Sequence, residues 1–171
     1  TSLLDGRRLV MFMDEFWIWL ADVEFSKFSL NMLKVIRKLN GIFIPATQSP
    51  DEIVRHPIAP AIIEQCSTQI FLANPKASHT DYVEKMKVPE SVYDMVRNLD
   101  PSEHYMVVLK TPLRAGETRP FIAMARMDLS GLGNITKILS GSEDNLKIFD
   151  AIYQEGMSPQ NWKDTFLNHA I

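Results

Sequence analysis

The chain has 171 residues, of which 46% are hydrophobic and 23% are charged, and its formal net charge is −3. This composition predicts a soluble globular domain with a sizeable core and argues against a disordered tail. The slight acidity argues against a dedicated nucleic-acid surface, because phosphate contacts require clustered Lys and Arg. The one cysteine, Cys66, allows no disulfide within the chain, favours a reducing compartment, and is expected to be a buried small hydrophobe rather than a nucleophile.

The first predicted element is a short strand over Leu9–Met13, which is wholly apolar. Such a run is typical of a strand covered on both faces, as in a parallel sheet. Helical periodicity follows over Ser26–Asn40, and a second apolar run over Ile42–Thr47 predicts another strand. Pro45 is expected near the end of that strand or at a bulge, because proline cannot donate to the hydrogen-bond ladder.

The remaining elements alternate between helix and strand and end in helices. A capping box at Ser49–Glu52 predicts the start of a short helix. Further along the chain, we expect a third strand at Ser67–Ala73 and two helices, at Ser78–Met86 and Pro89–Asn98. A hairpin follows, with strands at His104–Lys110 and Arg119–Met127 and a polar turn that contains Arg-Ala-Gly-Glu. This order predicts an α/β domain with a mainly parallel sheet, an antiparallel hairpin and C-terminal helices. A boundary near Gly141–Ser142 is expected to separate residues 1–141 from a helical appendage, 142–171.

Two acids, Asp14 and Glu15, directly follow the first strand. An apolar strand that ends in Asp-Glu is typical of the Walker B motif of phosphate-loop NTPases, and it delivers both acids to the sheet edge where open α/β folds bind ligands. In such a site Asp14 would hold Mg²⁺ through water, and Glu15 would polarise the water that attacks the γ-phosphate of ATP. The alternative is that both are ordinary surface acids at a strand end.

The second strand is followed by Thr47 and Gln48. If the two strands are parallel neighbours, these residues lie beside the acid pair. A glutamine there can hydrogen-bond both the attacking water and a phosphate oxygen, so it can report hydrolysis as a loop movement. The alternative is a polar segment that precedes a helix, and both interpretations can hold together.

Arg37 and Lys38 close the helix between the first two strands. Cations at a helix C-terminus are favourable in any protein. The sharper hypothesis is that Arg37 acts across a subunit boundary as an arginine finger.

Aromatic residues cluster after the acids, at Phe16, Trp17, Trp19 and Phe25. We expect them to pack in the core against the sheet, with a docking surface for another subunit as the alternative.

Several motifs together carry a family resemblance. In chain order they are VMFMDEFW, RKLNG, ATQSPDE, IIEQCSTQIFLANPKA and DLSG followed by LSG. Over about Leu9 to Gly141 they resemble the carboxyl-terminal ATPase domain of the large conjugative-transfer ATPase of bacterial type IV secretion systems. The resemblance implies a RecA-like motor that hydrolyses ATP with Mg²⁺. It also implies assembly as a hexamer, or as dimers of a larger array, at the cytoplasmic face of the inner membrane. There the motor would work with other secretion subunits and power pilus assembly and substrate transfer.

Carried over by position, Asp14 and Glu15 match the Walker B acids of that family and Gln48 matches its sensor glutamine. Arg37 matches the Arg-Lys segment of related hexameric motors. The family's phosphate-binding loop has no counterpart, since none of the 7 glycines is followed by lysine. We therefore expect the chain to be a fragment that begins just before Walker B and that does not bind or hydrolyse ATP well alone.

Two other functions remain open at this point. One is a DNA-pumping hexameric ATPase of the related coupling type, which predicts basic, aromatic-bearing pore loops. The other is a non-catalytic RecA-like scaffold for secretion subunits. A phosphate-binding loop in the sequence before Thr1 would favour a motor, and a degenerate loop would favour the scaffold.

Overall fold

The computed structural model describes residues 7–48, 50–112, 119–139 and 141–170. The chain divides into two compact units, residues 1–126 and 127–171. The boundary expected at Gly141–Ser142 therefore lies inside the second unit. Two predicted features fall outside the described residues: the Ser49 cap and the Arg-Ala-Gly-Glu turn, residues 114–117.

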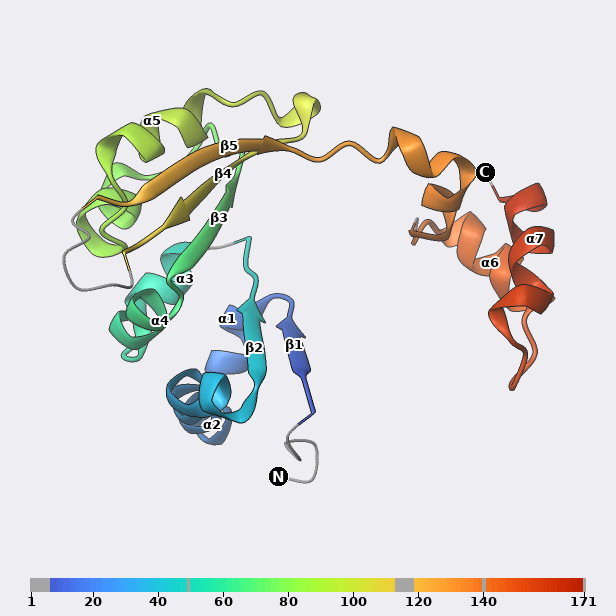
Figure 1. Cartoon of the computed structure of the whole chain (residues 1–171), viewed down its shortest axis with the longest axis horizontal. Coiled ribbons are helices and arrows are strands. Elements are labelled where there is room, and N and C mark those ends of the chain that lie inside the picture. The colour runs from blue at the N-terminus through green and yellow to red at the C-terminus, as the bar shows by residue number, and fades with distance from the viewer. Residues whose placement is uncertain (1–6, 49, 113–118, 140, 171) are drawn as a thin grey trace. The chain divides into compact units, whose positions relative to one another are not determined.

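Unit 1 begins with a parallel pair of strands. β1 (Leu9–Met13) pairs with β2 (Gly41–Pro45), with Leu9 opposite Gly41 and Met13 opposite Pro45. Pro45 is the last residue of β2, as the sequence predicted. The connection between the strands is helical, and in Figure 1 it runs through α1 (Phe16–Leu20), α2 (Val23–Val35) and the 3₁₀ helix η1 (Ile36–Leu39).

Local signals set the two ends of this helical connection. The Asp22 carboxylate accepts a hydrogen bond from the Phe25 backbone N–H at 2.7 Å, so α2 begins before the predicted Ser26. At the other end Asn40 has a left-handed backbone (φ 58°), which stops the helix. Gly41 then fits because a Cβ there would lie only 2.5 Å from Ile36 Cγ1.

The β1–β2 pair is covered by helices on one face. Met13 of β1 and Phe43 of β2 pack against a buried cluster of Phe16, Leu20, Leu33, Ile53 and Ile62. The opposite face is exposed and apolar, with its side chains contributed by Val10, Phe12, Ile42 and Ile44. Because successive strand residues point to opposite faces, the expectation that β1 is covered on both faces is wrong for the described residues.

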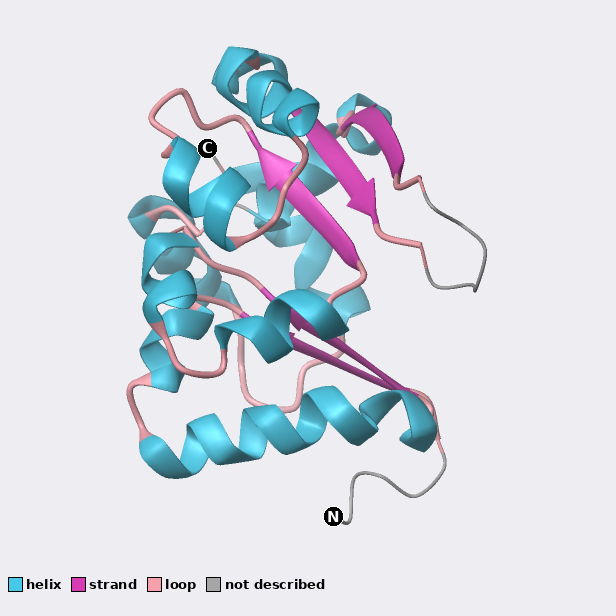
Figure 2. Ribbon diagram, turned by 90° about the vertical axis from the view of Figure 1, so that its left-hand side faces the viewer, coloured by secondary structure: helices cyan, strands magenta, loops and turns pink. Residues whose placement is uncertain are grey.

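The third strand does not join the parallel pair. β3 (Thr68–Leu72) pairs antiparallel with β4 (Tyr105–Lys110), which pairs antiparallel with β5 (Phe121–Arg126). The mixed α/β class is confirmed and so is the antiparallel hairpin, but the mainly parallel sheet is wrong for the strands described (Figure 2). Two helices, α3 (Pro50–Arg55) and α4 (Ala59–Gln65), connect β2 to β3. A helical connection does not make the two strands neighbours, and the hydrogen-bonding partner of β3 comes from the hairpin instead.

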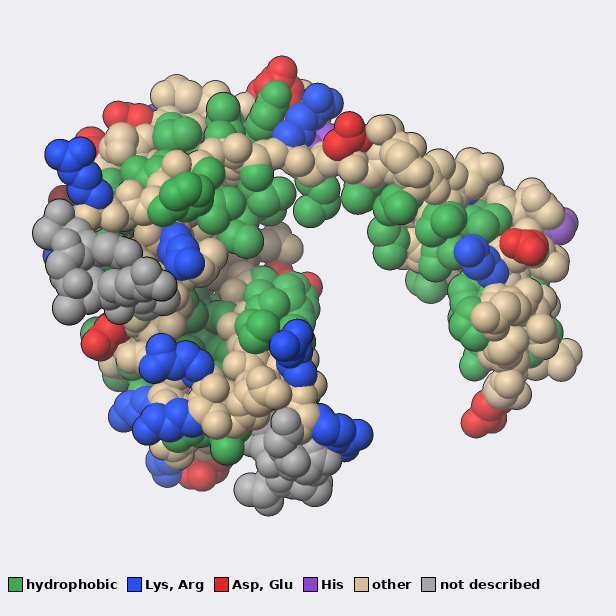
Figure 3. Space-filling view, in the orientation of Figure 1, with side chains coloured by type: hydrophobic (Ala, Val, Ile, Leu, Met, Phe, Trp, Pro, Cys, Tyr) green, Lys and Arg blue, Asp and Glu red, His purple; other side chains and the backbone are tan. Residues whose placement is uncertain are grey.

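The antiparallel sheet has its own core. The segments between β3 and β4 are a π-helix, an α-helix and a 3₁₀ helix, namely η2 (Thr80–Lys85), α5 (Glu90–Asn98) and η3 (Pro101–Glu103). Side chains of η2 and α5 pack on Phe71, Val107 and Leu109 of the sheet. The opposite face exposes Ile70, Leu72 and Phe121. Figure 3 shows hydrophobic side chains at the surface over both sheets of unit 1.

Unit 2 is helical, as the sequence predicted for the tail. It begins with η4 (Ser130–Leu139), which consists of two short 3₁₀ segments on either side of a kink at Gly133. Two α-helices follow, α6 (Glu143–Ile152) and α7 (Pro159–His169). Phe149 of α6 contacts Trp162 and Phe166 of α7 edge-to-face, so these aromatic side chains pack within the unit. In the part of the chain that is described, no helix has both the length and the apolar content of a membrane span.

Candidate functional site at the strand ends

The acid pair occupies a tight turn between β1 and α1. Asp14 is exposed and Glu15 is half-buried. Glu15 has a left-handed backbone (φ 46°, ψ 49°), which is uncommon for a residue with a side chain. Its N–H donates to the Asp14 carboxylate at 3.0 Å. The turn therefore places both carboxylates beyond the carboxyl end of β1.

Backbone hydrogen bonds join this turn to the end of β2. The Ala46 N–H donates to the Met13 carbonyl oxygen, and the Phe16 N–H donates to the Ala46 carbonyl oxygen, both at 2.8 Å. Thr47 and Gln48 directly follow Ala46. The parallel register predicted for these two strands is confirmed. The structure thus brings the segment that carries Asp14 and Glu15 beside the segment that carries Thr47 and Gln48.

Arg37 lies at the other end of the strands. It belongs to η1, which directly precedes β2, whereas Gln48 follows the carboxyl end of β2. Its side chain is exposed. The structure therefore does not bring Arg37 together with the acid pair of the same chain, and its role as a finger toward a neighbouring subunit stays a prediction.

Two tryptophans contact the acidic turn, and sequence reasoning missed these contacts. The Trp17 indole Nε1–H donates to Glu15 Oε2 at 2.9 Å, and the Trp19 indole Nε1–H donates to the Asp14 carbonyl oxygen at 3.2 Å. Both side chains are exposed, Trp17 at 37% and Trp19 at 48%, whereas Phe16 is 1% exposed. Core packing, which the sequence predicted for the whole aromatic cluster, thus holds for Phe16 and not for these two. The sequence spacing could have indicated these hydrogen bonds, since each tryptophan lies within five residues of an acid.

The donor atoms at the turn suit a hydrated magnesium ion. Mg²⁺ prefers oxygen ligands and keeps much of its water shell, so one exposed carboxylate such as Asp14, aided by a neighbouring hydroxyl such as Thr47, is an adequate protein contribution. Within the described residues no group of three or more His, Cys, Asp or Glu side chains could hold a metal.

Two other titratable residues lie away from this turn. Cys66 packs, half-buried, against the first core, and burial raises the pKa of its thiol. That environment agrees with the packing role expected of it. Glu64 lines a shallow hollow of about 340 Å³ together with Lys85 and Lys87.

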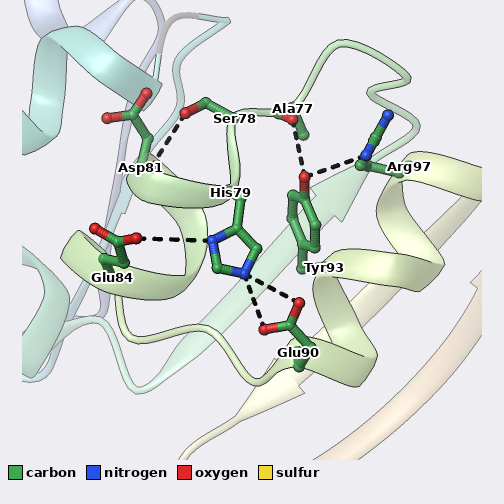
Figure 4. A network of polar contacts seen from close by, with 8 residues as sticks. All are labelled: Ala77, Ser78, His79, Asp81, Glu84, Glu90, Tyr93 and Arg97. Carbon is green, nitrogen blue, oxygen red and sulfur yellow. Dashed lines mark hydrogen bonds and ion pairs between the residues drawn. The ribbon is translucent and has the colours of Figure 1, made fainter.

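A surface network around His79 links η2 to α5 (Figure 4). His79 Nε2 lies 3.0 and 3.1 Å from the two carboxylate oxygens of Glu90, and His79 Nδ1 lies 3.8 Å from Glu84. The ring also meets Tyr93 edge-to-face, with centroids 5.2 Å apart. These contacts join neighbouring elements of the second core and do not involve the acid pair.

No protein-family model matches the chain. Several curated proteins do. The type IV secretion system protein virB4 of Bartonella quintana is 36% identical over 166 residues, which cover 96% of this chain and 20% of that protein. The virB4 protein of Brucella abortus biovar 1 is 35% identical over 164 residues (95% and 19%), and the type IV secretion system protein PtlC of Bordetella pertussis is 33% identical over 166 residues (95% and 19%).

The chain spans about one fifth of the length of the curated relatives it matches. Nearly all of it aligns with them, which confirms the resemblance expected from its motifs. The chain is thus homologous to proteins of type IV secretion systems. Over nearly its whole length it aligns with about one fifth of virB4 and PtlC.

Proposed function

We propose that this chain is the Walker B-bearing part of a RecA-like, ATP-hydrolysing motor domain in a longer parent protein. One observation carries the proposal: an Asp-Glu turn and a Thr-Gln segment meet at the carboxyl ends of two parallel strands. Ligands of open α/β folds bind at that edge. Homology to virB4 and PtlC, which are type IV secretion system proteins, supports the same interpretation.

Each residue of the site has a proposed role. Asp14 holds the water shell of Mg²⁺, and Thr47 adds a hydroxyl beside it. Glu15 orients the attacking water and accepts its proton. Gln48 hydrogen-bonds that water and the γ-phosphate, because its amide has both a donor and an acceptor. When it is bound with ATP, Mg²⁺ supplies the positive charge that offsets the charge of the phosphates.

The exposed sheet faces support the proposal of a larger domain. Parallel strands occur almost only in sheets with both faces covered, yet one face of the β1–β2 pair exposes Phe12 and Ile44. In the proposed RecA-like domain, other parts of the parent protein cover this face and supply the phosphate-binding loop. The sheet that appears here as two pieces would be completed there.

The wider role follows from the family. We infer that the parent protein energises type IV secretion, including conjugative transfer and pilus assembly, together with other subunits of the system. It works as a hexamer at the cytoplasmic face of the bacterial inner membrane. In that assembly Arg37, which lies away from the acid pair of its own chain, is available to a neighbouring subunit.

The test is the substitution Glu15→Gln in the parent protein, with steady-state ATPase activity and ATP binding measured separately. We expect turnover to fall at least about 100-fold, because the amide keeps the shape of the side chain but cannot accept a proton. ATP binding should be retained. Glu103→Gln, an exposed acid in η3, is the matched control and should leave turnover unchanged. Normal turnover in Glu15→Gln would remove Glu15 from this role, and equal losses in both variants would indicate a general effect of charge.

A further inference from the structure

The side chain of Glu15 has a specific partner. The Trp17 indole N–H donates to Glu15 Oε2 at 2.9 Å. An indole nitrogen is a donor only, and its hydrogen bond to a charged carboxylate is stronger than one between neutral groups. This contact therefore favours one orientation of the carboxylate.

The backbone of Glu15 is also restrained on both sides. Its own N–H donates to the Asp14 carboxylate at 3.0 Å, and the next N–H, that of Phe16, donates to the Ala46 carbonyl oxygen at 2.8 Å. A left-handed backbone at a residue other than glycine persists where its surroundings determine it. With the backbone fixed, the orientation of the carboxylate depends on the side-chain torsions, and Trp17 acts on these.

Core packing does not account for Trp17. Its side chain is 37% exposed and belongs to neither of the two buried clusters in unit 1. The second indole, that of Trp19, packs on Phe25 in a tilted arrangement, with ring centroids 5.1 Å apart, and also donates to the backbone carbonyl of Asp14 in the turn. Trp19 thus holds the turn itself, while Trp17 holds the carboxylate.

We propose that Trp17 is a positioning residue that sets the carboxylate of Glu15 for proton transfer from the attacking water. This inference rests on the function proposed above. A carboxylate held in one orientation contributes to the chemical step, because misplacement by about 1 Å can lower a rate strongly. Trp17 has no assigned contact with nucleotide, so its loss should lower kcat and leave KM for ATP unchanged.

The test uses the parent protein with Trp17→Phe, which removes the N–H donor and keeps an aromatic ring. We expect kcat to fall about tenfold, the effect of losing one charged hydrogen bond, with KM for ATP and the melting temperature unchanged. The matched control is Trp162→Phe in unit 2, where the ring packs among Phe149 and Phe166. This control should keep the kcat of the unaltered protein.

A second variant separates the hydrogen bond from packing. Trp17→His loses the same indole but keeps a ring N–H, so positioning predicts a higher kcat for Trp17→His than for Trp17→Phe. An unchanged kcat in Trp17→Phe would overturn the inference, as would a joint change in KM and melting temperature, or equal kcat values in the two variants. Glu15→Gln is measured beside them. If it alone loses turnover, only the role of Trp17 fails, whereas if it retains turnover the proposed function fails as well.

Discussion

The contrast between Phe16 and Phe12 allows a quantitative test of the fold around the acidic turn. Phe16 is 1% exposed, and its ring meets Phe43 of β2 edge-to-face with centroids 5.5 Å apart. Truncation of a buried phenylalanine to alanine lowers the free energy of unfolding by about 3–5 kcal/mol. Phe12 of β1 is 63% exposed, so its truncation removes only a minor part of the transfer free energy, about 1 kcal/mol.

The assay is urea unfolding of the 171-residue chain, followed by tryptophan fluorescence. Of the 3 tryptophans, Trp17 and Trp19 lie in unit 1 and Trp162 lies in unit 2. In a Trp162→Phe background the signal therefore reports unit 1. With an m-value of about 2 kcal/mol/M, Phe16→Ala should lower the midpoint by more than about 1 M and Phe12→Ala by about 0.5 M. Equal shifts for the two variants would refute the assignment of the covered and exposed faces.

Two further predictions concern stability in unit 1. Lys85 Nζ donates a hydrogen bond to the Asp81 carboxylate at 2.7 Å, and this contact lowers the pKa of that carboxyl. The ion pair therefore stabilises the folded state at a pH above the ordinary pKa of aspartate, and this stabilisation is lost as the pH falls through the lowered pKa. Asp81→Asn should lower the free energy of unfolding by about 0.5 kcal/mol at pH 7, and this effect should shrink as acid protonates Asp81. An effect that does not shrink with falling pH would contradict this reasoning. Gly41→Ala should lower the free energy of unfolding by about 1–3 kcal/mol because its Cβ would meet Ile36. Gly131→Ala, whose Cβ would have no atom within 4 Å, should change the stability of unit 2 little, measured in urea titrations that keep Trp162 as the reporter of that unit. Equal effects would show that the close approach at Gly41 is absent.

Much of the local structure could be predicted from the sequence. The apolar run Leu9–Met13 gives β1 with the predicted bounds, and Pro45 ends β2 because it lacks a donor for the ladder. These features depend on residues close together in the chain. The proximity of Thr47 and Gln48 to the acid pair also followed, since it needs only one parallel pairing.

The rest depends on contacts that sequence patterns do not encode. The sequence of Thr68–Leu72 does not indicate that this strand pairs antiparallel with β4 rather than with β2. Likewise, because every residue of β1 is apolar, its sequence could not show that one of its faces is exposed in this chain. The hydrogen bond from Trp17 to Glu15 depends on the left-handed backbone of Glu15, and such a backbone cannot be predicted from sequence at a glutamate.

The proposed function requires the acidic turn after β1 to hold the metal of a bound nucleotide. The most direct measurement is the affinity of the ADP-bound parent protein for Mn²⁺, used in place of Mg²⁺ and followed by electron paramagnetic resonance. Asp14→Asn should weaken Mn²⁺ binding about tenfold, because it removes the negative charge that holds the water shell of the ion. The control is Asp22→Asn, which keeps the helix cap at Phe25 and should leave the affinity unchanged. An unchanged affinity in Asp14→Asn would contradict this role of Asp14.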